Sequence, residues 1–230
     1  MSAVMKSEMK SLVFVHGYLG GSQQWPEQVK ALSNDFRVIT PDLPGFGLSD
    51  KMQTPETING LAQYVLDELD KAGVDRFHLV GHPMGGMIVQ EMTAIAPERV
   101  EKLVLYGTGS IGKMPGRFET IEESRQRLMQ DGVKATARRI AATWFLHGED
   151  SASYEGCAAI ALMAQQQAAL SCLSAMESWS GVSALPKIES PTLILWGDGD
   201  RAYLWQQTEQ LWRDIKTSSL AVIPGCSHAV

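Results

Sequence analysis

The chain has 230 residues and a formal net charge of −6, and 44% of its residues are hydrophobic. This length and composition suffice for one hydrophobic core, while the acidic balance argues against nucleic acid or an anionic membrane as a partner. Residues 1–10 lack a secretion signal, and no apolar run reaches the roughly 18 residues of a membrane span. The three cysteines lack C-x-x-C spacing, so they indicate neither disulfides nor a zinc site. We therefore expect a cytoplasmic protein.

Six short apolar runs predict buried strands. Between most of them, apolar residues recur at helical spacing, which predicts helices. Runs that are apolar on both faces are typical of central strands in a parallel sheet. The pattern therefore predicts an α/β fold with a doubly wound, mostly parallel six-stranded sheet. The predicted strands are residues 11–15, 36–40, 77–80, 102–106, 191–196 and 219–223.

Capping residues indicate where the first helices begin. Ser22 is expected to cap the helix that carries Trp25, Val29 and Leu32 on one face. Thr54 and Pro55 are expected at the N-cap and first position of the next helix, which Gly73 ends. The helix after the fifth strand is expected to place Leu204, Leu211, Trp212 and Ile215 on one face.

The strand and helix alternation lapses over residues 111–184, where the pattern predicts helices only. An insert of this length needs a function of its own, and a lid over a site fits that requirement. We therefore expect residues 1–110 and 185–230 to form the core and residues 111–184 to form a helical cap.

The segment Gly81–Gly85 lies between a predicted strand and a predicted helix. A strand, a tight glycine turn and a helix form the setting of the G-x-S-x-G nucleophile elbow, but residue 83 is proline. Proline has no attacking oxygen and fixes φ near −65°, so we expect an unstrained turn followed by a helix from Met84. Ser110 is a poor substitute because no helix begins within a turn of it.

Other chemically suggestive residues follow the ends of predicted strands. The glycine-rich loop 16–21 follows the first strand, Asp198 and Asp200 follow the fifth, and His228 follows the sixth. Ligands bind beyond the carboxyl ends of the strands in such sheets. Nucleophile position, acid and histidine also occur in the chain order of the hydrolase triad. The alternative interpretation makes the acids a solvated turn and His228 an incidental terminal residue.

Five segments together carry a resemblance to a known family. They are VHGYLGG, PDLPGFGLSD, GHPMGG, LWGDGD and GCSHAV, and they span residues 12–228 with 111–184 as the variable cap. The chain resembles the α/β-hydrolase superfamily, in the branch of small bacterial carboxylesterases, enol-lactonases and meta-cleavage-product hydrolases. The resemblance implies a hydrolase without a metal or cofactor.

The resemblance also implies roles for single residues. The backbone N–H groups of Tyr18 and Met84 would form the oxyanion hole, and His228 would be the general base. Asp200 would be the triad acid, with Asp198 as the alternative. The substrate pocket is expected to include Gly17, Leu19, His82, Trp144 and Phe145.

The sequence departs from the family at Pro83, and it ends at Val230 where relatives continue into a further helix, which we expect to be absent.

Three accounts of function follow. The first is an esterase-like serine hydrolase that the proline makes inactive or impaired. The second is a non-catalytic protein that binds small molecules, and the third is base catalysis by His228 and Asp200 without a nucleophile. The expected partner is a small ester, lactone or keto-acid, and the expected assembly is a monomer or homodimer.

Overall fold

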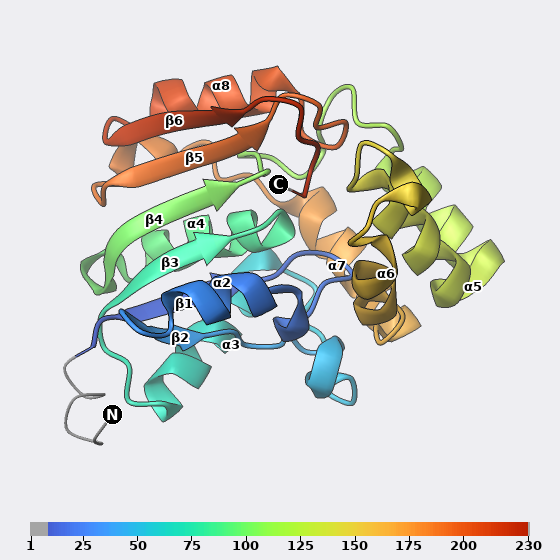
Figure 1. Cartoon of the computed structure of the whole chain (residues 1–230). Helices are drawn as coiled ribbons and strands as arrows, with labels where there is room; N and C mark the ends of the chain where they lie inside the picture. Colours follow the sequence, from blue (N-terminus) through green and yellow to red (C-terminus); the bar gives the residue numbers. More distant parts are fainter. Residues whose placement is uncertain (1–8, 230) are drawn as a thin grey trace.

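Six strands form one sheet in the order β2-β1-β3-β4-β5-β6, and every neighbouring pair is parallel (Figure 1). The computed structural model describes residues 9–229. All six predicted strands are present, so the predicted α/β fold is confirmed. Their bounds are β1 (Ser11–Val15), β2 (Arg37–Ile39), β3 (Phe77–Gly81), β4 (Val100–Tyr106), β5 (Thr192–Gly197) and β6 (Ser218–Ile223).

Helices cover both faces of this sheet. On one face, Val29 and Leu32 pack with Leu12 and Phe14 of β1, so α2 covers that side. The other face, which includes Val13, carries the main core and is covered by α3, α4 and α8. The helices are α2 (Pro26–Leu32), α3 (Ile58–Lys71), α4 (Met84–Ile95), α5 (Ile121–Thr143), α6 (Tyr154–Ala161), α7 (Gln166–Ser178) and α8 (Trp205–Asp214).

Two predicted helix starts are wrong. The Ser22 hydroxyl donates to Asp42 at 3.0 Å instead of capping α2, which begins with Pro26. Thr54 donates its hydroxyl to a backbone carbonyl in the preceding loop, and Thr57 caps α3. In both cases a tertiary hydrogen bond outcompetes the local cap. The predicted end of α3 is confirmed, since Gly73 follows that helix with φ of 66°.

The predicted apolar face of α8 is also partly wrong. Leu211 and Ile215 are buried in the core, but Trp212 is 45% exposed. Successive residues of an α-helix point about 100° apart, so Trp212 cannot share the face of Leu211.

Between β4 and β5 the chain forms α5, α6 and α7, which lie together beyond the carboxyl ends of the strands (Figure 1). A bridge between Ile111 and Ser180 joins the two ends of this insert. The predicted helical content is therefore present, while the division into core and cap stays a prediction. Within residues 9–229, no single helix is long and apolar enough to cross a membrane; α6 and α7 qualify only as a pair bent by 97°.

Glycines allow the close approach of β3 and α4 to the first strand. A Cβ on Gly81 would lie 2.3 Å from the carbonyl oxygen of Gly85, and a Cβ on Gly85 would lie 2.1 Å from that of Val15. Real Cβ atoms do not come this close, so side chains at either position would separate the strand from the helix. The glycine pattern of the elbow is thus required even though Pro83 lies at its centre.

His16 ties the end of β1 to the loop that follows β2. Its Nε2 accepts from the Leu43 N–H at 2.9 Å, so Nδ1 carries the proton and donates to the Gly17 carbonyl at 2.9 Å. Burial lowers the pKa of His16 from 6.5 to about 4. A second proton, on Nε2, would set two N–H donors against each other at Leu43, so the folded protein holds His16 neutral.

We expect the free energy of unfolding to fall as the pH is lowered from about 6.5 to about 4. The unfolded chain binds a proton at His16 in this window while the folded chain does not, so the His16 contribution is complete above pH 6.5 and lost below it. The loss from His16 is roughly 3 kcal/mol. Urea unfolding at several pH values measures this slope. His16→Gln should make this slope less steep, whereas His147→Gln, on an exposed turn residue, should leave it unchanged.

Candidate active site

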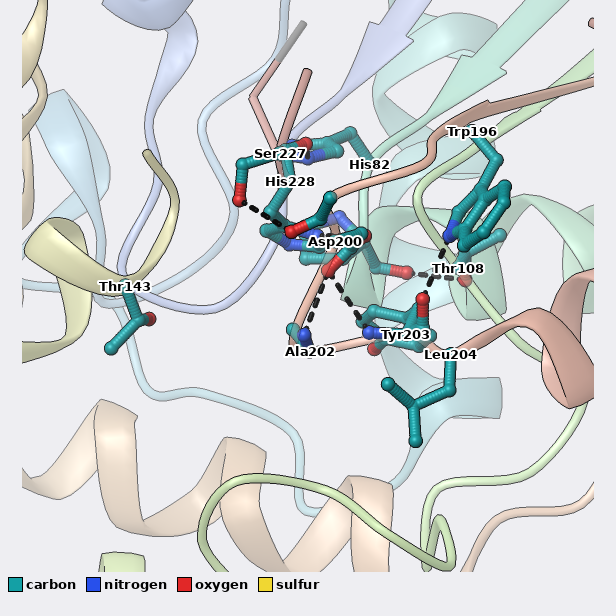
Figure 2. A network of polar contacts seen from close by, with 12 residues as sticks. His82, Thr108, Thr143, Trp196, Asp200, Ala202, Tyr203, Leu204, Ser227 and His228 are labelled. Carbon is teal, nitrogen blue, oxygen red and sulfur yellow. Dashed lines mark hydrogen bonds and ion pairs between the residues drawn. The ribbon is translucent and has the colours of Figure 1, made fainter. Parts of the chain in front are cut away.

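Asp200 and His228 form a buried pair beyond the ends of β5 and β6 (Figure 2). The His228 Nδ1 donates to the Asp200 Oδ2 at 2.8 Å, which confirms the predicted contact. The other carboxylate oxygen, Oδ1, accepts from the N–H groups of Ala202 at 2.7 Å and Tyr203 at 3.1 Å. Because Nδ1 carries the proton in this arrangement, the lone pair of a neutral His228 is on Nε2. Asp198 instead accepts from the Gly225 N–H, so it does not face the imidazole.

Two further residues hold the His228 ring. The Tyr203 ring stacks on it with centroids 5.4 Å apart and planes within 6°. The Tyr203 carbonyl in turn accepts from the Trp196 indole N–H at 2.8 Å (Figure 2). On another side, a Cβ on Gly107 would lie 3.2 Å from the His228 Nδ1, so backbone lies directly against the ring. Sequence reasoning missed both residues, although a glycine directly after β4 is a signal of close approach.

His82 supports the backbone of His228. Its Nε2 donates to the His228 carbonyl at 3.0 Å, and its ring stacks on Tyr106 with centroids 4.1 Å apart. Burial, and secondarily the nearby His228 ring, lower the pKa of His82 well below its ordinary value. His82 is therefore a neutral residue that fixes the loop of the candidate base, and it also lines a neighbouring cavity.

Pro83 adopts the conformation predicted for it. Its φ is −75° and its ψ is −47°, and α4 begins at Met84 immediately after it. The Pro83 carbonyl accepts from the Gly86 N–H at 3.0 Å and from the Thr108 hydroxyl at 2.6 Å. The strained turn of a nucleophile elbow is therefore absent, and residue 83 presents no oxygen.

The glycine loop after β1 lies against this turn. A Cβ on Gly17 would lie 2.0 Å from the Cδ of Pro83, so the two segments are in direct contact. The backbone N–H groups of Tyr18 and Met84 donate to no other residue in the described part of the chain. Two unpaired donors, one in the glycine loop and one at the first residue of α4, are compatible with an oxyanion hole, and that assignment stays a prediction.

Two cavities adjoin Pro83. The larger, about 810 Å³, is lined by Gly17, His82, Trp144 and Phe145 among others, and their role in binding substrate stays a prediction. The smaller, about 40 Å³, is lined by His228, and Tyr18, Pro83 and Trp144 line both. The Trp144 carbonyl also accepts from the Ala229 N–H at 2.9 Å, which ties the end of α5 to the loop of the candidate base.

Two residues considered from sequence lie elsewhere. Leu19 lines neither cavity, because its side chain is fully buried in the core and its backbone has φ of 58°. It therefore shapes the glycine loop rather than the pocket, and its assignment to the pocket is not supported. Ser110 is buried and donates its hydroxyl to Gln210 at 2.8 Å. In the described residues, no three His, Cys, Asp or Glu side chains lie together as metal ligands would.

Comparison with known proteins identifies the family. The sequence model of the alpha/beta hydrolase fold matches residues 10–230. The chain belongs to the alpha/beta hydrolase fold family. Within it, the chain is 27% identical over 245 residues to the 2-hydroxy-6-oxo-6-phenylhexa-2,4-dienoate hydrolase of Comamonas testosteroni, covering 96% of this chain and 82% of that protein.

Two further similarities agree with this family. Over 226 residues the chain is 26% identical to RutD of Pseudomonas savastanoi pv. phaseolicola, named as a candidate carbamate hydrolase, with 95% and 86% of the two chains covered. The enol-lactonase from Burkholderia xenovorans LB400 superposes with a TM-score of 0.87 at 23% identity, covering 96% of this chain and 85% of that one. This alpha/beta hydrolase thus shares its fold with enzymes that cleave several kinds of bond.

Proposed function

We propose that the site of this alpha/beta hydrolase is organised to cleave carboxylic esters, lactones or related C–C bonds by a serine–histidine–aspartate mechanism. We propose further that this chain, with Pro83 in the nucleophile position, is inactive or strongly impaired. The observation that carries the proposal is the buried pair of His228 and Asp200, complete and oriented, beside a residue that has no attacking oxygen.

The proposed chemistry assigns one task to each group. A hydroxyl at position 83 would attack the substrate carbonyl while the His228 Nε2 takes its proton, and Asp200 would stabilise the imidazolium that forms. The N–H groups of Tyr18 and Met84 would hold the oxyanion. His228 would then protonate the leaving group, and water would release the acyl group by the same steps in reverse.

The cavities support a small substrate held between core and insert. About 810 Å³ falls within the range of roughly 300–1,000 Å³ typical of small-molecule sites. Trp144 and Phe145 line this cavity from the end of α5, so the helical insert would act as the lid. The names of the relatives, which include an enol-lactonase and a C–C bond hydrolase, support this substrate class.

A fluorophosphonate probe, which labels activated serines, tests the proposal. The chain with Pro83 should remain unlabelled, because within residues 9–229 no hydroxyl is hydrogen-bonded to His228. Pro83→Ser should be labelled, and the added change His228→Ala should prevent labelling by removing the base. Labelling of the unaltered chain at any serine, dependent on His228, would contradict the proposal by revealing a nucleophile elsewhere.

A further inference from the structure

The smaller cavity has a cation on its wall. Arg117, in the loop between β4 and α5, lines it together with Tyr18, Tyr203 and His228. Its guanidinium makes no ion pair or hydrogen bond with another described residue, and its one contact of note is with the adjacent Phe118 ring, 5.5 Å away. Arg117 is only partly exposed, and a guanidinium beside a cavity with no protein partner is available to an anionic ligand.

The other cations near this loop are already paired. Arg139 donates to the buried carboxylate of Glu119 at 2.6 Å, and Arg127 approaches the same carboxylate at 3.5 Å. Lys113 pairs with Glu177 at 3.1 Å. Arg117 is therefore the cation of this loop region that remains available to a ligand, on a chain whose net charge is −6.

A second, independent observation comes from Tyr18. The residue is 6% exposed and lines both cavities, yet its hydroxyl is buried without a hydrogen-bond partner in the described part of the chain. Buried polar groups are nearly always paired, so this hydroxyl is expected to meet a polar ligand atom. Burial raises the pKa of Tyr18, so at neutral pH the hydroxyl is protonated and able to donate.

We propose that Arg117 and the Tyr18 hydroxyl bind a carboxylate at one end of the substrate in the smaller cavity. Its volume of about 40 Å³ has room for one small polar group, since about 10–15 Å³ of such volume already holds a water molecule. The scissile carbonyl would lie beside Pro83, which lines both cavities, and the leaving group would occupy the larger one. Placing the carboxylate on the acyl side rests on the proposed function. The preferred substrates would then be half-esters of short dicarboxylic acids, or lactones that carry a second, free carboxylate.

Binding of monomethyl succinate and of dimethyl succinate, measured by isothermal titration calorimetry, tests the subsite. The two esters differ in one negative charge, and the chain with Pro83 is not expected to consume them. We expect the monoanion to bind about ten-fold more tightly than the neutral ester, because its carboxylate would form charge-assisted hydrogen bonds with Arg117. Arg117→Gln should abolish this preference, and Arg117→Lys should keep part of it because a lysine supplies charge without the planar fork. Tyr18→Phe should weaken monoanion binding several-fold.

Lys113→Gln is the matched control, because it removes one positive charge from the same loop without touching the cavity. It should leave the preference intact. Equal binding of the two esters, binding of neither at millimolar concentration, a preference that survives Arg117→Gln, or an equal loss in Lys113→Gln would each overturn the subsite.

Hydrolysis by Pro83→Ser separates this inference from the proposed function. An active Pro83→Ser protein that treats both esters alike would retain the function and reject the subsite. An inert Pro83→Ser protein that still selects the monoanion through Arg117 would retain the subsite and reject the function.

Discussion

The Pro83→Ser variant is expected to hydrolyse p-nitrophenyl acetate and butyrate several orders of magnitude faster than the chain with proline. The base, its acid and two unpaired backbone donors are present, and the attacking oxygen is the missing part. Such groups act as a unit, since loss of the serine from a protease triad costs about 10⁶ in kcat and leaves about 10³–10⁴ over the uncatalysed reaction. Initial rates for the two proteins measure the gain.

The gain in rate requires residue 83 to adopt the strained, positive-φ conformation of a nucleophile elbow. Removing the proline ring removes its contact with Gly17, and Gly81 and Gly85 already allow the close approach that an elbow needs. A serine held at positive φ costs of the order of 1–3 kcal/mol, which the packing of β3 and α4 must offset. A structure of Pro83→Ser should therefore show positive φ at residue 83 in place of −75°.

Pro83→Ala is the matched control, because it removes the ring without supplying an oxygen. It should remain at background, and Pro83→Ser with His228→Ala should lose the gain. Turnover by the unaltered chain that disappears on His228→Ala would instead favour base catalysis without a nucleophile. A folded Pro83→Ser protein that is inert on esters, lactones and C–C substrates would favour a binding protein.

The fold could be predicted because its signals are local and repeated. Strands such as β1 are apolar on both faces, which only burial between two layers of helices explains. The starts of α2 and α3 could not be predicted, because Ser22 and Thr54 have tertiary partners that lie far along the chain or in another loop. A capping preference of about 1 kcal/mol is easily exceeded by such contacts.

Two parts of the site could be predicted from sequence: contacts that follow from the order of the strands, and backbone angles that follow from the covalent geometry of one residue. Asp200 and His228 follow adjacent parallel strands, so their meeting is a consequence of topology, and the ring of Pro83 fixes its own φ. The stacking of Tyr203 and the unpaired Arg117 depend on how two irregular loops pass the strand ends. Loops of this kind have no periodic pattern, so only the structure places these side chains.

Asp200→Asn, made in the Pro83→Ser background, is expected to lower kcat by about 10⁴, the size of the effect in a serine protease triad. The reason lies in the two oxygens of Asp200. The Oδ1 is held by the N–H groups of Ala202 and Tyr203, which require an acceptor at that position. An asparagine would keep its carbonyl oxygen there and turn its NH₂ toward the His228 Nδ1.

That substitution reverses the tautomer of His228. An NH₂ donor at Nδ1 requires the lone pair to be on Nδ1, so the proton moves to Nε2 and the base can no longer accept a proton from the serine. The shape of the site should be preserved, because asparagine and aspartate are nearly isosteric. Unfolding by urea should therefore show a small change in stability beside the large loss in rate.

Asp198→Asn, in the same background, provides the comparison. Asp198 lies two residues away in the same turn and accepts from the Gly225 N–H, not from the imidazole. We expect its kcat to stay within about ten-fold of the Pro83→Ser protein, since asparagine keeps an oxygen that accepts from the Gly225 N–H and the contact of Asp200 with the imidazole is unchanged. Steady-state kinetics on p-nitrophenyl acetate distinguish the two acids. An equal loss from both substitutions, or a larger loss from Asp198→Asn, would show that the carboxylate behind His228 has been assigned to the wrong residue.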